Sequence, residues 1–423
     1  MFAKNSAAGC LLLLMSLGSA AHSAEIPTAK PEDVGMSAAA LAKIDTVMAD
    51  LVRDKKLAGG IVLVARHGKI VYFQSSGLMD IEANKPMTND AILRFYSMTK
   101  AITTAAALAL CEDGKLGLDD PVSKHLPELK ALKVASDKVA SDAADQTPER
   151  EMTIRDLMRH TAGLSYGSSG NAKADQAFGA AKVLDPDTTL ATMTEKVGKL
   201  PLAFAPGKDW CYGISTDVLG RVCEVASGQP LDAFLQQRIL GPLDMLDTAF
   251  FVPSDKLPRF AANYTSDGKG KLTLLDDPAK SRYLQSPKLL SGGGGLVSTA
   301  RDYLRFLLMV AQGGELDGVR ILKQDTVALM RTNQLPAEVG SIKFGKEVRE
   351  GVGFGLGFCV RDKMSSFDPN GRLGEYGWGG AASTHYWVSP KDDLIVIVLE
   401  QTMPYSFLTE FALKGLIYEA VGK

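Results

Sequence analysis

The sequence predicts an α+β fold in which both ends of the chain form one antiparallel sheet flanked by helices, while the middle forms an inserted, mainly helical subdomain. Runs of β-type apolar residues occur near both ends of the 423-residue chain. Between them, apolar residues recur at helical spacing, and neither a repeat nor a long linker interrupts the pattern. We therefore expect a single domain over residues 25–423, with an α/β part at about 25–105 and 330–423 and a helical part at about 106–329.

The first strands are expected shortly after an N-terminal helix. Residues 37–55 predict an amphipathic helix, because their apolar side chains recur every three to four positions. Two short apolar runs at 60–65 and 70–73 predict a β-hairpin that turns at 67–69. Residues 98–112 are rich in alanine and leucine and predict a long helix.

The middle of the chain begins with a short helix at 153–159, where Thr153 and Asp156 have the T-x-x-D spacing of a capped helix start. The four glycines at 292–295 predict a flexible or closely packed turn. Residues 254–290 show no period and carry no assignment. The remaining predicted elements are helices at 218–240, 302–312 and 407–418 and strands at 384–388 and 394–399.

Composition and charge exclude several classes of partner. The chain is 46% hydrophobic and 23% charged, which is typical of a globular protein with an ample core. Its net charge is −2 and it has no basic tract, so neither nucleic acid nor an anionic membrane is an expected partner. The histidines and cysteines match no metal-binding spacing, so we expect no metal, and nothing in the sequence calls for a cofactor. The oligomeric state and any disulfides are left open by the sequence; the cysteines concerned are Cys111, Cys211, Cys223 and Cys359.

The N-terminus predicts an exported protein. Lys4 precedes an apolar run at residues 9–17, and small residues follow up to Ala24. This order is typical of a secretory signal peptide, and the run is too short to span a membrane. We expect residues 1–24 to be removed, at a bond between Ala20 and Ala24, and the mature protein to be periplasmic or secreted and free of the membrane.

Residues 163–167, Gly-Leu-Ser-Tyr-Gly, match the G-x-S-x-G nucleophile elbow of α/β-hydrolases. That elbow needs a strand before the serine and a helix after it. Here a short predicted helix precedes Ser165, and a glycine- and serine-rich loop follows it. We therefore expect Ser165 to be a loop residue, with an α/β-hydrolase as an alternative that Ser165→Ala tests.

A second serine has a better context for catalysis. Ser97 and Lys100 form an S-x-x-K motif at the start of the predicted helix 98–112, whereas the same motif at 266–269 lies in a polar turn. Positions i and i+3 of a helix share a face, so the Lys100 amine can reach the Ser97 hydroxyl. We expect desolvation to lower the pKa of Lys100, so that the amine accepts the serine proton.

At this point the chain resembles the serine β-lactamases and penicillin-binding proteins, and in particular the class C β-lactamase-like family VIII carboxylesterases. Ser97-Met98-Thr99-Lys100 is similar to the first motif of that family, and residues 153–164 resemble its helix-to-loop signature. This resemblance implies that Ser165 lies in a structural loop. It also implies that Tyr212, in a P-G-x-x-x-x-Y segment, acts as a base beside Lys100.

The third motif is expected at residues 376–383. Trp378-Gly379-Gly380 resembles the W-G-G strand of family VIII esterases, whose glycines would let the substrate lie against the backbone. By the family's pattern, the N–H groups of Ser97 and Ala381 would form the oxyanion hole.

The resemblance implies an esterase that hydrolyses a small ester or amide through an acyl-enzyme on Ser97. Trp378 stands where a lactamase has lysine, and the Tyr212 motif lacks the lactamase asparagine, so ester hydrolysis is favoured over lactam hydrolysis. A β-lactamase, a D-amino-acid or linear-peptide hydrolase and an acyltransferase of the same fold remain alternatives. A non-catalytic binding domain is a further alternative, which intact Ser97, Lys100 and Tyr212 disfavour.

Overall fold

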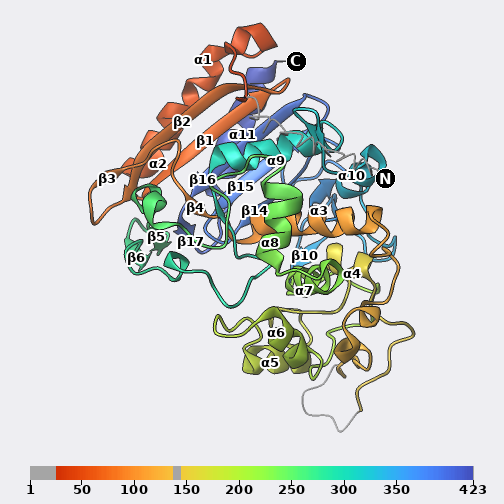
Figure 1. The fold of residues 1–423 in the computed structure, drawn as a ribbon. Coiled ribbons are helices and arrows are strands. Elements are labelled where there is room, and N and C mark those ends of the chain that lie inside the picture. Colours follow the sequence, from red (N-terminus) through yellow and green to blue (C-terminus); the bar gives the residue numbers. More distant parts are fainter. Residues whose placement is uncertain (1–24, 137–143, 423) are drawn as a thin grey trace, which may run out of the picture.

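The computed structural model describes residues 25–136 and 144–422 (Figure 1). The predicted signal peptide, residues 1–24, lies outside the described residues. Within the described part of the chain, no helix is both long and apolar enough to cross a membrane.

One eight-stranded antiparallel sheet forms the centre of the molecule, and both ends of the chain build it, as predicted. Strand β1, from the N-terminal part, pairs along its length with β16, from the C-terminal part. The strands, in spatial order, are β12 (Val352–Phe354), β13 (Cys359–Arg361), β14 (Tyr376–Gly380), β15 (Thr384–Ser389), β16 (Leu394–Glu400), β1 (Gly59–Arg66), β2 (Lys69–Asp80) and β3 (Lys85–Pro86).

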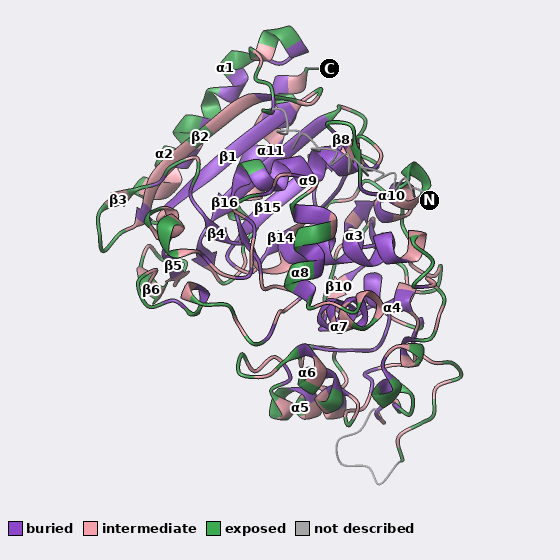
Figure 2. Cartoon of the chain, in the orientation of Figure 1, coloured by how far each residue is buried: buried purple, intermediate pink, exposed green. Residues whose placement is uncertain are grey.

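The central strands of the sheet are buried on both faces. In β1, Ile61 and Leu63 point into the larger core, while Val62 and Val64 point into a second core on the opposite face. This period of two is what a strand with two covered faces requires. Figure 2 shows the resulting layer of buried strands between helices. The second core is closed by α1 (Ala38–Leu41), α2 (Lys43–Arg53) and the C-terminal α11 (Leu408–Val421).

Helices cover the other face and continue away from the sheet, with α5 and α6 farthest from it in Figure 1. The expected boundaries near 106 and 329 fall inside α3 and α10, because both helices run on past them. The helices between α2 and α11 are α3 (Thr99–Glu112), α4 (Ile154–Met158), α5 (Ala172–Ala181), α6 (Leu190–Val197), α7 (Ser215–Ser227), α8 (Leu231–Leu235), α9 (Ala300–Ala311) and α10 (Gln324–Arg331).

Two predicted helices are interrupted. The helix expected at 37–55 breaks at Ala42 into α1 and α2. The helix expected at 218–240 ends at Gly228, whose φ of 73° is left-handed, and Pro230 follows; the chain then re-enters helix as α8 and a π-helical turn. Gly and Pro are common just after a helix end, but the apolar spacing continues past them here, so the sequence predicts one longer helix.

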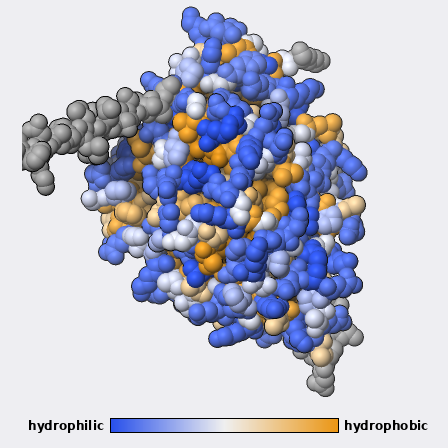
Figure 3. Space-filling model, turned by 45° about the vertical axis from the view of Figure 1, so that its right-hand side comes forward, coloured by the Kyte–Doolittle hydropathy of each residue, from blue (hydrophilic) through white to orange (hydrophobic). Residues whose placement is uncertain are grey.

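The unassigned residues 254–290 hold two 3₁₀ segments, Ser254–Arg259 and Arg282–Leu284, and two strands of a small sheet. Most of the face in Figure 3 is hydrophilic, with hydrophobic residues gathered in separate patches.

The remaining strands are β4 (Leu93–Arg94), β5 (Asn263–Ser266), β6 (Leu272–Asp276), β7 (Val297–Ser298), β8 (Glu315–Leu316), β9 (Val319–Arg320), β10 (Lys343–Phe344), β11 (Glu347–Val348) and β17 (Thr402–Met403).

Candidate active site

Ser97 lies in a single 3₁₀ turn, Tyr96–Met98, that leads directly into α3. The preceding residue, Tyr96, has a φ of 43°, a left-handed conformation that costs a bulky residue of the order of 1–3 kcal/mol. Its hydroxyl accepts a hydrogen bond from Asn263 Nδ2 at 3.1 Å. A constrained turn therefore presents Ser97 at the N-terminal end of a buried helix, as the sequence predicts.

Lys100, one helical turn further on, is only 2% exposed. Its Nζ donates three hydrogen bonds, to Ser97 Oγ at 3.3 Å, to the Tyr166 hydroxyl at 3.1 Å and to the Gly293 carbonyl at 2.7 Å. An ammonium group has three N–H donors, and each of them has an acceptor here. The geometry is that of a charged lysine held against the serine hydroxyl.

The expected lowering of the Lys100 pKa is therefore wrong. Burial by itself lowers this pKa, but the phenol oxygens of Tyr166 and Tyr212 and the carboxylate of Asp217 together raise it above its ordinary value. The sequence pattern showed the burial of the amine but not its acceptors. In the substrate-free protein the cation is thus available to stabilise negative charge, and a neighbouring group has to accept the serine proton.

Tyr212 also contacts the Lys100 ammonium, through the face of its ring. Lys100 Nζ is 4.6 Å from the centre of the Tyr212 ring, and Trp378 Nε1 donates a hydrogen bond to the Tyr212 hydroxyl at 3.2 Å. The structure thus brings together four of the residues singled out in the sequence, and Trp378, expected to bind substrate, also orients the tyrosine. Aromatic rings pack around the pair, among them Trp210 and Phe344.

Tyr166 is the residue that the sequence analysis missed. It belongs to the Gly-Leu-Ser-Tyr-Gly segment, where attention fell on the serine. Ser165 is buried, and its hydroxyl donates to Asp175 Oδ1 at 3.0 Å and accepts from the Gly167 N–H at 2.8 Å. This serine closes a turn, and the tyrosine beside it reaches Lys100.

Two close backbone contacts bring the tyrosines to the same lysine. The Cys211 N–H donates to the His160 carbonyl at 3.0 Å, and a side chain at Gly213 would lie 2.2 Å from the Leu164 carbonyl. Gly213 is therefore required for the Tyr212 segment to pack against the loop that carries Tyr166. The sequence contains this signal only as a glycine after Tyr212.

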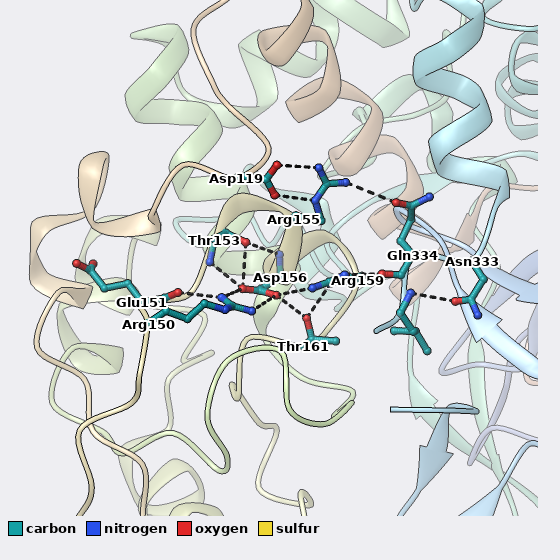
Figure 4. A network of polar contacts seen from close by, with 11 residues as sticks. Asp119, Arg150, Glu151, Thr153, Arg155, Asp156, Arg159, Thr161, Asn333 and Gln334 are labelled. Atoms are coloured by element: carbon teal, nitrogen blue, oxygen red, sulfur yellow. Dashed lines mark hydrogen bonds and ion pairs between the residues drawn. The ribbon is translucent and has the colours of Figure 1, made fainter. Parts of the chain in front are cut away.

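A buried carboxylate anchors the start of that loop (Figure 4). Asp156 forms the predicted capping box with Thr153, and it accepts further hydrogen bonds from Thr161 Oγ1 at 2.8 Å and from Arg159 at 3.0 Å. Arg150 pairs with the same carboxylate. Burial raises the pKa of Asp156, but its hydrogen bonds with Arg150, Thr153 and Thr161 outweigh burial, and the net effect is a lowered pKa.

Asp156→Ala is expected to destabilise the fold by roughly 3 kcal/mol or more, because it leaves a largely buried arginine, Arg159, without its carboxylate. A lowered pKa stabilises the fold above the unfolded value of about 3.9, and this contribution disappears as the pH falls through the folded value. In urea unfolding, the difference in the free energy of unfolding between wild type and variant is therefore large at about pH 7 and becomes smaller below about pH 4. A difference that does not depend on pH would contradict the account. The control is Asp156→Asn, which removes the charge of the side chain but keeps its shape.

The glycines at 292–295 form a closely packed turn rather than a flexible one. A side chain at Gly293 would lie 2.4 Å from Asp217 Oδ2, and the Gly293 N–H donates to Asp217 Oδ1 at 3.1 Å. Asp217, fully buried on α7, also accepts from Ser291 Oγ. This carboxylate fixes the turn whose carbonyl holds Lys100.

The third motif comprises β14 and the three residues after it. A side chain at Gly380 would lie 2.4 Å from the Phe95 carbonyl, two residues before the serine, and one at Gly379 would meet the Tyr405 hydroxyl at 2.9 Å. These glycines are therefore needed for packing against the protein, and both also line a cavity that contains Ser97. They bring the end of β14, and Ala381 after it, against the turn that carries Ser97.

Two cavities meet at Ser97, and Ala381 lines both of them. The first has a volume of about 440 Å³ and runs past Tyr212 and Trp378 under β14. The second, of about 570 Å³, runs past Tyr166 and the glycine turn. The described residues contain no group of three histidine, cysteine, aspartate or glutamate side chains placed to hold a metal ion, and the four cysteines among them are free thiols.

Comparison with known proteins agrees with this geometry. The family model described as Beta-lactamase matches residues 44–414. Protein Rv1367c of Mycobacterium tuberculosis is 36% identical, over 82% of this chain and 86% of its own length. Esterase EstB of Burkholderia gladioli is 32% identical, over 88% of this chain and 93% of its own length.

A solved structure shows the same architecture. EstCE1, described as a hydrolase with promiscuous acyltransferase activity, superposes with a TM-score of 0.76 and 27% sequence identity. The match covers 90% of this chain and 99% of that one. With its α+β fold, its S-x-x-K serine at the start of α3 and these matches, the chain belongs to the β-lactamase family and is a serine hydrolase.

Proposed function

We propose that the protein is a carboxylesterase that hydrolyses small esters through an acyl-enzyme on Ser97. The contact between Ser97 Oγ and the buried ammonium of Lys100, at the junction of two cavities, carries this proposal. One cavity can hold the acyl part of an ester and the other its alcohol part. The similarity to an esterase over almost the whole chain supports the same reaction.

The proposed reaction has two steps. Ser97 Oγ bonds to the ester carbonyl carbon, and its proton passes to the phenolate oxygen that Tyr212 contributes to this step, beside the Lys100 ammonium and the Trp378 N–H. The carbonyl oxygen becomes an oxyanion held by the N–H groups of Ser97 and Ala381. The carbon–oxygen bond to the alcohol then breaks, and the leaving oxygen takes the proton from Tyr212.

Water completes the cycle. It gives a proton to Tyr212, attacks the acyl carbon and releases the acid, and Ser97 recovers its proton as its bond to carbon breaks. Tyr166, the other phenol in contact with Lys100, is the second candidate for the same proton transfer. Throughout, Lys100 remains charged and stabilises the phenolate and the oxyanion.

A panel of substrates tests the reaction class. We expect p-nitrophenyl esters of short acids to be hydrolysed with burst kinetics, and a chromogenic cephalosporin and short peptides to be turned over far more slowly. Trp378, in place of a cation on β14, is the reason for poor lactam turnover. Faster hydrolysis of the cephalosporin or of a peptide than of every ester would contradict the proposal.

Acyl transfer is a second candidate activity. The second cavity, which runs past Tyr166, can hold an acceptor alcohol in place of water. EstCE1 is described as having promiscuous acyltransferase activity. Adding a primary alcohol to the ester assay separates the two outcomes. A new ester product indicates transfer, whereas free acid alone indicates hydrolysis.

We further propose that residues 1–24 direct export and are then removed, because charge, apolar run and small residues follow in the order of a signal peptide. N-terminal sequencing of the mature protein is expected to begin between Ala21 and Glu25. An intact Met1 in the native host would contradict export to the periplasm or the medium.

A further inference from the structure

The first cavity contains an arginine that the proposed reaction does not use. Arg349 follows the exposed hairpin of β10 and β11, and its backbone is fixed by hydrogen bonds to Ile342 and Val352. Its side chain turns inward and is only 11% exposed. Because Arg349 and Ser97 line the same cavity, a substrate bound at the serine extends toward this guanidinium.

Aromatic rings surround the guanidinium. Its central carbon lies 4.1 Å from the centre of the Phe344 ring and 4.8 Å from that of Phe407, with Phe367 at 5.5 Å and Trp378 at 5.9 Å. Such contacts stabilise a desolvated cation but supply no hydrogen-bond acceptor in the plane of the guanidinium group. The cage therefore holds the charge in place and leaves its Nε–H group without an acceptor among the described residues.

Within the described ranges, no buried carboxylate lies within 4.0 Å of this arginine. Arg349 Nε is buried without a hydrogen-bond partner among the described residues, and the nearest carboxylate, Glu347, is 3.9 Å away and 60% exposed. An exposed pair at that distance contributes little. A buried cation left in this state is costly unless an anion approaches it.

The other two cations in the cavity wall, Arg361 and Lys414, are already paired with carboxylates. Lys414 contacts three carboxylates at 2.7–3.0 Å, those of Glu375, Asp368 and Glu410. Arg361 pairs with Asp368 at 2.8 Å. These groups hold α11 against the sheet, and their contacts leave Arg349 as the cation in this wall that has no close anion among the described residues.

We propose that Arg349 binds a carboxylate carried by the substrate. On the proposed esterase reaction, the natural substrates are then esters whose acid or alcohol part bears a second, ionised carboxyl group. A guanidinium donates two parallel hydrogen bonds to a carboxylate, a pairing that a lysine in the same place cannot reproduce. The volume of about 440 Å³ lies within the range of small-ligand sites.

Three phenyl esters test the proposal: neutral phenyl butanoate, 4-carboxyphenyl butanoate with the charge on the alcohol, and monophenyl glutarate with the charge on the acid. In Arg349→Met, kcat/KM for one of the charged esters falls by about 10–100-fold, while that for the neutral ester changes by less than about threefold. Comparing each ester between wild type and variant cancels its intrinsic reactivity. The ester affected shows which half of the substrate occupies this cavity.

Arg301→Met is the matched control, since Arg301 also lies over a ring, that of Phe73 at 5.3 Å, but outside both cavities. It is expected to affect all three esters equally. Glu347→Gln removes the competing carboxylate and is expected to raise the preference for the same charged ester. An equal loss on all three esters in Arg349→Met, or no loss on any, would overturn the proposal.

A binding measurement keeps the proposal testable if Arg349→Met fails to fold or if no ester is hydrolysed. In Ser97→Ala, calorimetry compares 4-hydroxybenzoate and glutarate with their uncharged amides. At least one acid is expected to bind roughly tenfold or more tightly than its amide. Equal affinities would contradict the carboxylate site even if ester hydrolysis is confirmed. Tight binding of an acid without any ester turnover would contradict only the proposed esterase activity.

Discussion

Replacing Ser97 by alanine lowers kcat for ester hydrolysis by about 10³-fold or more in a protein that stays folded. The reason is that this hydroxyl, in contact with Lys100 at the junction of the two cavities, is the group that would become acylated. The phenols that also contact Lys100 are much weaker nucleophiles. The change removes one hydrogen bond to a lysine that keeps two others. Steady-state kinetics with one p-nitrophenyl ester, together with a thermal unfolding scan, measures both parts.

The control for this prediction is Ser165→Ala. Ser165 bonds to Asp175 and to the N–H groups of Gly167 and Ser168, so its loss costs about 1–3 kcal/mol of stability. The kcat of the folded fraction is expected to change little. Abolished turnover in a normally folded Ser165→Ala protein would assign the nucleophile to the wrong serine.

Lys100→Ala and Tyr212→Phe are each expected to lower kcat/KM by about 10²–10⁴-fold, the range for a positioned acid–base group. Without Lys100, the phenolate and the oxyanion lose their cation. Without the Tyr212 hydroxyl, the serine proton loses its acceptor. Because the two residues act as one unit, the double variant is expected to resemble the worse single variant.

A double-mutant cycle on one ester measures that coupling. Additive losses would mean that the lysine and the tyrosine act independently, and the proposed proton path would fail. Tyr166→Phe extends the cycle, because Tyr166 also contacts Lys100. If Tyr166→Phe is as damaging as Tyr212→Phe, the proton passes through both phenols.

Much of this site could be predicted because its signals are local. Ser97 and Lys100 are three residues apart at a helix start, and the uninterrupted apolar runs of β1 and β16 predict strands at both chain ends. The capping box of Thr153 and Asp156 is likewise a short-range pattern. Each of these signals depends on residues that are neighbours in both sequence and structure.

What could not be predicted depends on contacts between distant segments. The pKa direction of Lys100 depends on Tyr166, Tyr212 and Asp217, which lie on two segments far along the chain. Arg349 has no motif, and only the packing of Phe344 and Phe407 around it sets it apart from a surface arginine. The close approach of the Phe95 carbonyl to Gly380 likewise joins segments that are far apart in the sequence.

Covalent labelling tests the central claim, an acyl-enzyme on Ser97, most directly. A p-nitrophenyl alkylphosphonate reacts with an activated serine, which bonds to phosphorus as p-nitrophenolate leaves. Mass spectrometry of the digested protein is expected to find the adduct on the peptide that contains Ser97, in wild type and in Ser165→Ala, and to find none in Ser97→Ala. An adduct on Ser165, or no adduct on a folded protein that hydrolyses esters, would contradict the account.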